Sequence, residues 1–482
     1  MIGDGRASVT MIAELARANL QDCSGNVPPA AIRAFASLGT SGANPQNSER
    51  DLHNWMKKLY GLRLETYCIT VQAQESNQTG LHEKELPFLL PHELLHAIAE
   101  ASEWQFSLSM TGGRTGLEIK QFWEHVVCHE EWKGHPVLLD PSIPRTRLIP
   151  LALHLDGAEF YSNCEFYVWS VGSVFASGEV WDVKFPCCIV PHSWMVSDHV
   201  KESIHKKVAE VLSWSFGCAA SGTWPQRGLD GEALFGERAA SAGKPLARNW
   251  RACYFGFKYD AKARKEANFF ERSYYHNQIC EACFAERPNK YGDPLLEHKD
   301  FYPGAAHLMT GLNHADYVRS MQQISPWAIM PGFHVWTCFR DPMHTIFLGT
   351  AKSLIASLIG LWIRRGCLGD ASLAEQLRKI SEEQTTHCKN AGVRAYFSTC
   401  TPANTGLDTP SEFPELGSRF KAASIKASLW YFSEKAVAVA EACARGNEPW
   451  PYTVQCFLHV YLSIGGTRLL CLDFLFAGCF PP

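Results

Sequence analysis

The chain has 482 residues, of which 46% are hydrophobic and 20% charged, with a formal net charge of −4. This composition is ordinary for a folded protein with more than one domain, and it excludes wholesale disorder and a uniformly basic nucleic-acid binder. The first 20 residues lack a basic start and a continuous apolar core, so we expect a nuclear or cytoplasmic protein that is not secreted, with its 18 cysteines reduced.

Residues 1–85 predict a mostly helical arm. Within it, Ser48 can cap a helix that carries Leu52, Trp55 and Leu59 on its apolar side, and residues 64–71 are a strand candidate. Residues 86–148 form a helical and aromatic segment ahead of the first long strand.

The most recognisable local motif is His92-Glu93-Leu94-Leu95-His96, which matches the HExxH pattern of zinc metallopeptidases. In that pattern two histidines four residues apart hold zinc, and the glutamate acts on its bound water. Pro91 puts the motif in the first turns of a helix, and the continuation offers no third ligand at metzincin spacing. We favour the alternative in which the leucines are buried and the histidines are partly exposed.

The region from 149 to 259 predicts a sheet. Alternating apolar residues over 149–160 indicate a strand that reaches Asp156-Gly157, and strands over 165–176 and 185–190 follow. A helix over 199–216, a Gly/Ala/Ser-rich insertion over 217–244 and a strand over 250–259 come next. The order is therefore strand, strand, strand, helix, strand.

Two of these strands end on or near a carboxylate, Asp156 on the first and Asp260 after the fourth. If the strands are neighbours, the two carboxylates can share divalent metal ions, although they are 104 residues apart. Each has a simpler explanation: Asp156-Gly157 is a common turn pair, and Asp260 can cap a following helix.

The segment from 276 to 314 is a small Cys/His element. Cys280 and Cys283 have metal-ligand spacing, but 18 cysteines would produce such a pair by chance, and two buried thiols are the alternative. Further on, Asp341 can cap a helix with Pro342 at its first position and His344 one turn later.

After residue 344 the chain is predicted to be helical. Residues 345–363 are nearly long enough to span a bilayer, but Lys352 in the middle favours a buried amphipathic helix and no membrane contact. We take 149–363 as the core domain and 364–482 as a helical region with a long helix over 421–445. The final stretch, 465–482, is unlike the end of a domain and indicates a truncated continuation.

Together these pieces resemble the ribonuclease H-like fold of DDE transposases, in particular the CACTA/En-Spm-like and Plavaka-like families. The likeness rests on the order of Leu153-His-Leu-Asp156-Gly, Tyr259-Asp260, His276-x3-Cys280-x2-Cys283 and Asp341-Pro-Met-His344, followed by Phe347-Leu-Gly. It implies an α/β fold: a ribonuclease H-like mixed sheet core with a helical surround and the small Cys/His insertion.

The resemblance also implies a site. Asp156 and Asp260 would hold Mg²⁺ or Mn²⁺, Asp341 and His344 would lie near the active site, and DNA would be the partner, with a homo-oligomer as a further expectation. The family's third acid is a glutamate on a late helix, for which Glu434 is the best-placed substitute. A structural Zn²⁺ would be held by His276, Cys280, Cys283 and His307.

The charge distribution adds candidate DNA contacts. Between residues 237 and 272 there are nine Lys or Arg against four acids, a surplus of five positive charges. A solvated surface face would give the same pattern. The residues expected to contact DNA are Lys258, Lys262, Arg264, Lys265 and Arg272.

Three functions follow from the sequence. The chain is either a transposase-like enzyme that cleaves and joins DNA, in an active or a degenerate form, or a non-catalytic DNA- or protein-binding transposon relic. The third is an HExxH zinc metallopeptidase.

Overall fold

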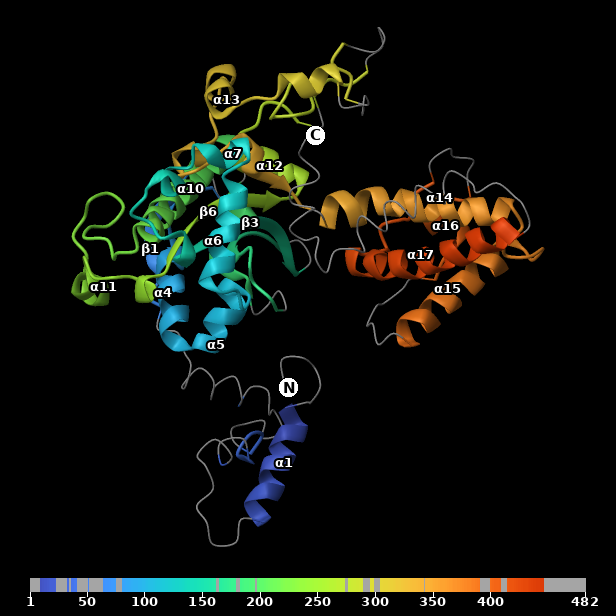
Figure 1. Ribbon diagram of the computed structural model, residues 1–482, viewed down its shortest axis with the longest axis horizontal. Coiled ribbons are helices and arrows are strands. Elements are labelled where there is room, and N and C mark those ends of the chain that lie inside the picture. Colours follow the sequence, from blue (N-terminus) through green and yellow to red (C-terminus); the bar gives the residue numbers. More distant parts are fainter. Residues whose placement is uncertain are drawn as a thin grey trace.

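The structure is a computed structural model, and it describes residues 9–22, 33, 36–40, 51, 64–74, 80–161, 164–178, 183–195, 197–273, 276–288, 295–298, 304–341, 343–390, 399–408 and 414–445. Figure 1 shows a sheet-containing body, a separate bundle formed by the later helices, and helix α1 (Val9–Asp22) near the N-terminus. The predicted helix that begins at Ser48 and the residues after 445 lie outside the described residues.

A seven-stranded mixed sheet forms the centre of the protein, in the spatial order β1-β2-β5-β4-β3-β6-β7. The strands β2, β5, β4 and β3 pair antiparallel, as do β1 and β2, whereas β6 and β7 continue the sheet parallel to β3. The bounds are β1 Tyr67–Ala73, β2 His82–Phe88, β3 Leu148–Tyr161, β4 Cys164–Ser173, β5 Phe185–Pro191, β6 Arg251–Tyr259 and β7 Cys338–Arg340.

Helices cover both faces of the sheet. On one face, α4 and α10 bury residues such as Ile98, Ile204 and Val208 against strand residues in the main hydrophobic core. On the other face, Trp123 of α6 and Trp132 of α7 pack on Phe255 and Phe339 in a smaller core. The helices of this body are α4 Pro91–Ala101, α5 Glu103–Phe106, α6 Gly116–Val126, α7 Glu130–Lys133, α8 Pro136–Leu139, α10 Asp198–Ser221, α11 Gly236–Ser241, α12 Ala261–Asn268 and α13 His314–Ser320.

Two of the sequence boundaries need correction in this body. Strands β1 and β2 join the sheet, so the predicted N-terminal arm contributes to it. Helix α10 also continues to Ser221, well past the predicted end at residue 216. Its last turns place Ala219 and Ala220 in the core, which explains why a Gly- and Ala-rich stretch remains helical.

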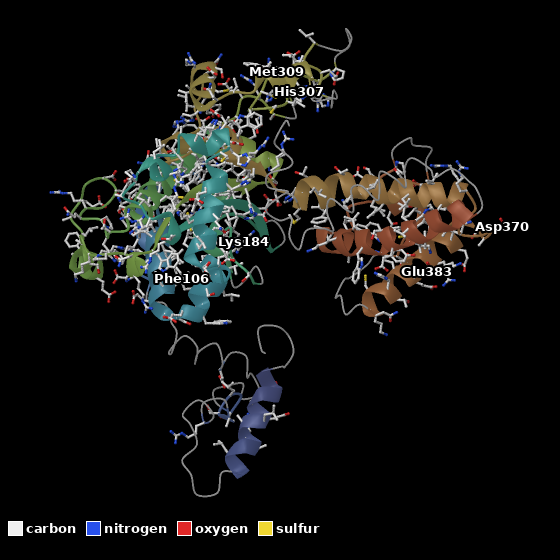
Figure 2. All side chains as sticks on the ribbon, viewed as in Figure 1. Phe106, Lys184, His307, Met309, Asp370 and Glu383 are labelled. Atoms are coloured by element: carbon white, nitrogen blue, oxygen red, sulfur yellow. The ribbon has the colours of Figure 1, made fainter. Side chains whose placement is uncertain are left out.

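The later helices form a second hydrophobic core of their own. They are α14 Ala351–Arg364, α15 Leu373–Asn390, α16 Pro402–Thr405 and α17 Ala422–Arg445. Ile355, Ile359 and Trp362 of α14 pack with Leu429 and Phe432 of α17. Because α14 belongs to this helical body, the division near residue 350 describes the packing better than the predicted boundary at 363. Figure 2 shows Glu383 within the same helical body.

The apolar segment Met343–Arg364 is, by length and composition, one candidate for a membrane-spanning helix among the described residues. Its first part, Met343–Thr350, is a wider helical turn with a kink at Gly349, and α14 follows. Lys352 is only 9% exposed, as the predicted buried helix requires.

Candidate functional site

Three aspartates occupy one row at the end of the parallel strands. Leu155 of β3 is opposite Tyr259 of β6, which is opposite Arg340 of β7. The next residue on each strand is an aspartate: Asp156, Asp260 and Asp341. Neighbouring strands lie about 4.8 Å apart, so the row brings Asp156 and Asp260 side by side across a single strand spacing. The amide of Asp341 donates to the Tyr259 carbonyl over 3.0 Å, which continues the ladder into the row.

The charges in this row act on one another. Asp156 is half-buried, and burial raises the pKa of its carboxyl above the ordinary value. Asp260 and Asp341 raise this pKa further, whereas His344 lowers it. A positive charge close to this carboxyl would stabilise its ionised form.

Asp260 also caps helix α12. Its Oδ1 accepts from the amide of Ala263 at 2.6 Å, which confirms the capping explanation from the sequence. The cap uses one carboxylate oxygen, so capping and a second role for Asp260 are compatible.

Asp341 and His344 form a close pair beside the other two aspartates. The distance from His344 Nδ1 to Asp341 Oδ2 is 2.7 Å, and Asp341 Oδ1 accepts from the Met343 amide at 3.2 Å. The two side chains are 33% and 15% exposed, respectively. These contacts fix the orientation of the imidazole ring relative to Asp341.

His154 is a site residue that the sequence reasoning missed. It lies two residues before Asp156 on β3, and alternate residues of a strand share a face. Burial lowers the pKa of His154 to about 4; Lys184, Lys258 and His344 lower it further, and Asp341 raises it. The two-residue spacing was the available signal.

Glu434 is not brought to this row. It lies on α17, where its Oε2 is 3.7 Å from His387 Nδ1 of α15, and its side chain is 58% exposed. Helix α17 buries its apolar side in the second core, which accounts for the placement of Glu434 in the helical body. The charges that act on Asp156 come from Asp260, Asp341 and His344.

Of the predicted zinc ligands, the two cysteines contact each other, whereas the two histidines lie in other surroundings. The thiols of Cys280 and Cys283 hydrogen-bond each other; this bond lowers the pKa of Cys280 to about 7 and raises that of Cys283. The Nδ1 of His276 lies 3.0 Å from the Ser273 hydroxyl. His307 is 9% exposed, and its Nδ1 has no hydrogen-bond partner among the residues that the structure describes. Among the described residues, no three His, Cys, Asp or Glu side chains are grouped so that they could hold a metal ion.

The basic residues singled out from the sequence are partly buried. Arg264 and Arg272 are each 8% exposed, whereas Lys262 is exposed on α12 and Lys258 is half-buried on β6. The guanidinium of Arg264 pairs with Glu281 at 2.6 Å. These residues therefore do not form one solvated basic face.

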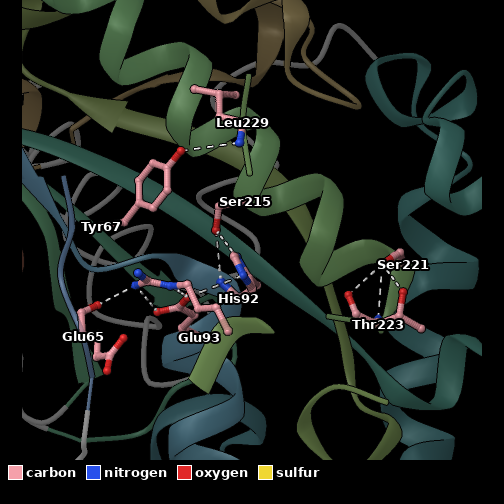
Figure 3. Close-up of polar contacts among 9 residues, drawn as sticks. Glu65, Tyr67, His92, Glu93, Ser215, Ser221, Thr223 and Leu229 are labelled. Atoms are coloured by element: carbon pink, nitrogen blue, oxygen red, sulfur yellow. Dashed lines mark hydrogen bonds and ion pairs between the residues drawn. The ribbon is translucent and has the colours of Figure 1, made fainter. Parts of the chain in front are cut away.

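Residues of the HExxH motif on α4 take part in a largely buried network of polar contacts (Figure 3). Glu93 forms a two-pronged ion pair with Arg238, at 2.6 and 3.0 Å. His92 is fully buried, with its Nδ1 2.8 Å from the Ser215 hydroxyl, and His96 Nδ1 accepts from the Ala247 amide. The leucines are buried as expected, but the expectation that both histidines are partly exposed is wrong for His92.

These contacts compete with the roles that the glutamate and the two histidines would have in a zinc peptidase. The Arg238 guanidinium occupies the carboxylate that a peptidase would use on water. Both histidine rings meet the Trp224 ring edge-on, and Trp224 lines a cavity of about 580 Å³. That cavity has no carboxylate or histidine in its lining, which includes Trp214 and Cys218.

Compared with known proteins, the chain matches no family model and no curated sequence.

Proposed function

We propose that this chain is a metal-dependent enzyme that cleaves and joins DNA phosphodiester bonds, resembling DDE transposases. The observation that carries the proposal is the row of Asp156, Asp260 and Asp341 at adjacent positions of three parallel strands.

The strand order supports the ribonuclease H-like part of the proposal. Three consecutive strands, β3, β4 and β5, pair antiparallel; α10 then crosses over, and β6 returns on the other side of β3, parallel to it. This is the order that the sequence resemblance implies, with the first acid on β3 and the second directly after its parallel neighbour β6.

The donor set at this edge suits magnesium or manganese. Mg²⁺ is commonly bound by one or two carboxylates, with water and substrate phosphates completing its shell, so a pair of aspartates suffices. Asp156 and Asp260 would hold the ions, which supply activation of the attacking oxygen and stabilisation of the leaving oxygen.

The remaining residues of the site would position the substrate. The 2.7 Å contact with Asp341 engages Nδ1 of His344, which leaves Nε2 as the ring atom for another partner. Half-buried His154 lies two residues before Asp156 on the same strand, so the two side chains share a face of the sheet. Neither role requires a proton transfer.

A cleavage assay tests the proposal. Purified protein is incubated with supercoiled DNA and Mg²⁺ or Mn²⁺, together with the variants Asp156→Asn and Asp260→Asn. Asp370→Asn, an exposed aspartate in the helical body, is the matched control. We expect nicking by the wild type and the control and its loss in the other two. Absence of metal-dependent nicking in the wild type, or nicking unchanged in both row variants, contradicts the proposal.

The non-catalytic alternative draws on the cationic side chains around α12, of which Lys262 is exposed. A protein that binds DNA with a steep salt dependence and cleaves none would select this alternative.

A further inference from the structure

A second cavity, of about 340 Å³, lies beside the aspartate row between α12 and the end of β7. We call it the α12 pocket and define it by its charged lining, which is Arg264, Lys265, Arg272, Glu281, Arg287 and Arg340. Its volume is at the low end for ligand pockets. It can hold a group the size of one phosphate, but not a nucleic-acid duplex.

The lining has a surplus of positive charge. Five cationic side chains face one carboxylate, and that carboxylate, Glu281, is engaged by Arg264. His298 on the rim lies 2.9 Å from the carboxylate of Glu297, so that acid is engaged at the rim.

Arg272 is the most informative member. It is 8% exposed; among the described residues its partners are the Cys283 carbonyl at 3.1 Å and the Phe284 ring at 4.1 Å, with no carboxylate in ion-pair range. Burial lowers the pKa of Arg272, while nearby Glu271 and Glu281 raise it. Because a buried charge without a counter-ion costs free energy, such an arginine indicates a site for an anion.

The pocket and the aspartate row share two elements. Helix α12 begins at Asp260 and carries Arg264 and Lys265 into the pocket; Arg340 ends β7 and Asp341 follows it. Ala261 and Arg340, which both line the pocket, are each one residue away from an aspartate of the row, Asp260 and Asp341 respectively.

We infer that the α12 pocket binds a backbone phosphate of the DNA strand whose neighbouring phosphodiester reaches Asp156 and Asp260. Arginine guanidinium groups match phosphate oxygens with paired hydrogen bonds, which explains why four of the five cations are arginines. The identification of the ligand as DNA rests on the proposed function, whereas the chemistry of the pocket requires only a phosphate group.

Measuring DNA binding in the absence of metal tests the pocket independently of catalysis. In EDTA, a fluorescent single-stranded oligonucleotide is titrated with the wild type, Arg272→Gln and Arg340→Gln. Arg365→Gln, exposed at the end of α14, is the matched control. Since a hydrogen bond to a charged group is worth about 1.5–3 kcal/mol, each pocket variant should weaken binding about tenfold or more and reduce the salt slope by about one.

Arg340 is exposed, so its variant is expected to fold even if the variant at buried Arg272 does not, and thermal melts check both. Unchanged affinity in Arg340→Gln together with a folded, unchanged Arg272→Gln overturns the inference. Competition by pyrophosphate supports a phosphate site. Pyrophosphate binding that the oligonucleotide does not displace would overturn the assignment to a DNA strand. If the pocket variants weaken binding but the wild type cleaves no DNA, the pocket stands and the proposed enzyme activity fails.

Discussion

The HExxH helix and the aspartate row contain similar residue types, yet they serve different purposes. In α4 the acid and both histidines are engaged by other parts of the fold: Arg238 pairs with Glu93, and Ser215 contacts His92. In the row, Asp156 and Asp260 come from segments far apart in the sequence, and the pairing of β3 with β6 places them side by side where β6 ends. The side chains of the HExxH motif are therefore engaged in contacts within the fold, whereas the proposed chemistry is assigned to the aspartate row.

The spacing of histidines within one helix is therefore weak evidence for a metal site unless the residues that face the helix are known. Histidines four residues apart share a helix face in any environment. Strand register, in contrast, places residues side by side independently of sequence distance.

The largest effect is expected at Asp260. Metal ions contribute several kcal/mol of transition-state stabilisation, so Asp260→Asn should lower the cleavage rate by about 1,000-fold or more. Asparagine caps helices as well as aspartate does, so the free energy of unfolding should hardly change, whereas Asp260→Ala should also cost about 1 kcal/mol of stability. Rates and denaturant melts of both variants check this. If Asp260→Asn retains full activity, Asp260 is only a helix cap.

The next effect concerns Glu93. Glu93 is buried, whereas the side chain of its partner Arg238 is 16% exposed, so Glu93→Gln leaves a partly buried charge. The substitution should destabilise the protein by about 1.5–3 kcal/mol. The exposed Glu103→Gln on the neighbouring helix is the control. The double variant Glu93→Leu/Arg238→Leu should recover part of the loss. Zinc that co-purifies with the wild type and disappears with Glu93→Gln or His92→Ala, in folded protein, would restore the peptidase hypothesis.

A third effect is expected from acid. Burial, with smaller contributions from Arg238 and His96, lowers the pKa of His92 from 6.5 to about 3. Because the unfolded chain takes up the proton first, the stabilisation by neutral His92 is present above pH 6.5 and is lost as the pH falls toward 3. Between pH 6.5 and 4 the loss should be roughly 3 kcal/mol.

Replacing His92 by Phe should flatten this acid limb of the stability curve. The variant His205→Phe should do the same, since burial lowers the pKa of His205 to about 3 as well. Unfolding free energies measured across this pH range check both variants. A wild-type curve that is flat from pH 6.5 to 4 would show that these histidines do not remain neutral in the fold.

The smallest effect is expected at Glu434. Because it pairs with His387 in the helical body, Glu434→Gln should change the cleavage rate by about twofold at most. A loss comparable to that of Asp156→Asn would place Glu434 in the catalytic site and require the two bodies to approach one another.

Much of the sheet could be predicted from the chain. Strands β3, β5 and β6 and helix α17 appear within a few residues of their expected ranges, and helix α4 begins at Pro91 as expected. Their apolar spacing and flanking turn residues are strong local signals. Strand β2, His82–Phe88, was missed because its charged residues alternate with few apolar ones, and it is held by pairing with β1.

The site was predictable only in part. Asp156 and Asp260 stood out as acids at strand ends, but their adjacency depends on β6 lying parallel beside β3, a long-range pairing. The alignment of Asp341 with them depends on the three-residue strand β7, which is too short to give a periodic signal. The burial of Arg264 and Arg272 depends on Glu281 and Phe284, which come from another segment.

The most direct test of the account is calorimetric titration of Mn²⁺ into the wild type, Asp156→Asn, Asp260→Asn and the control Asp370→Asn. The account predicts that the wild type and the control bind Mn²⁺ alike and that each row variant weakens binding about tenfold or more. Equal Mn²⁺ binding by all four proteins, or none by the wild type, would contradict the claim that the aspartates of the row hold a divalent ion.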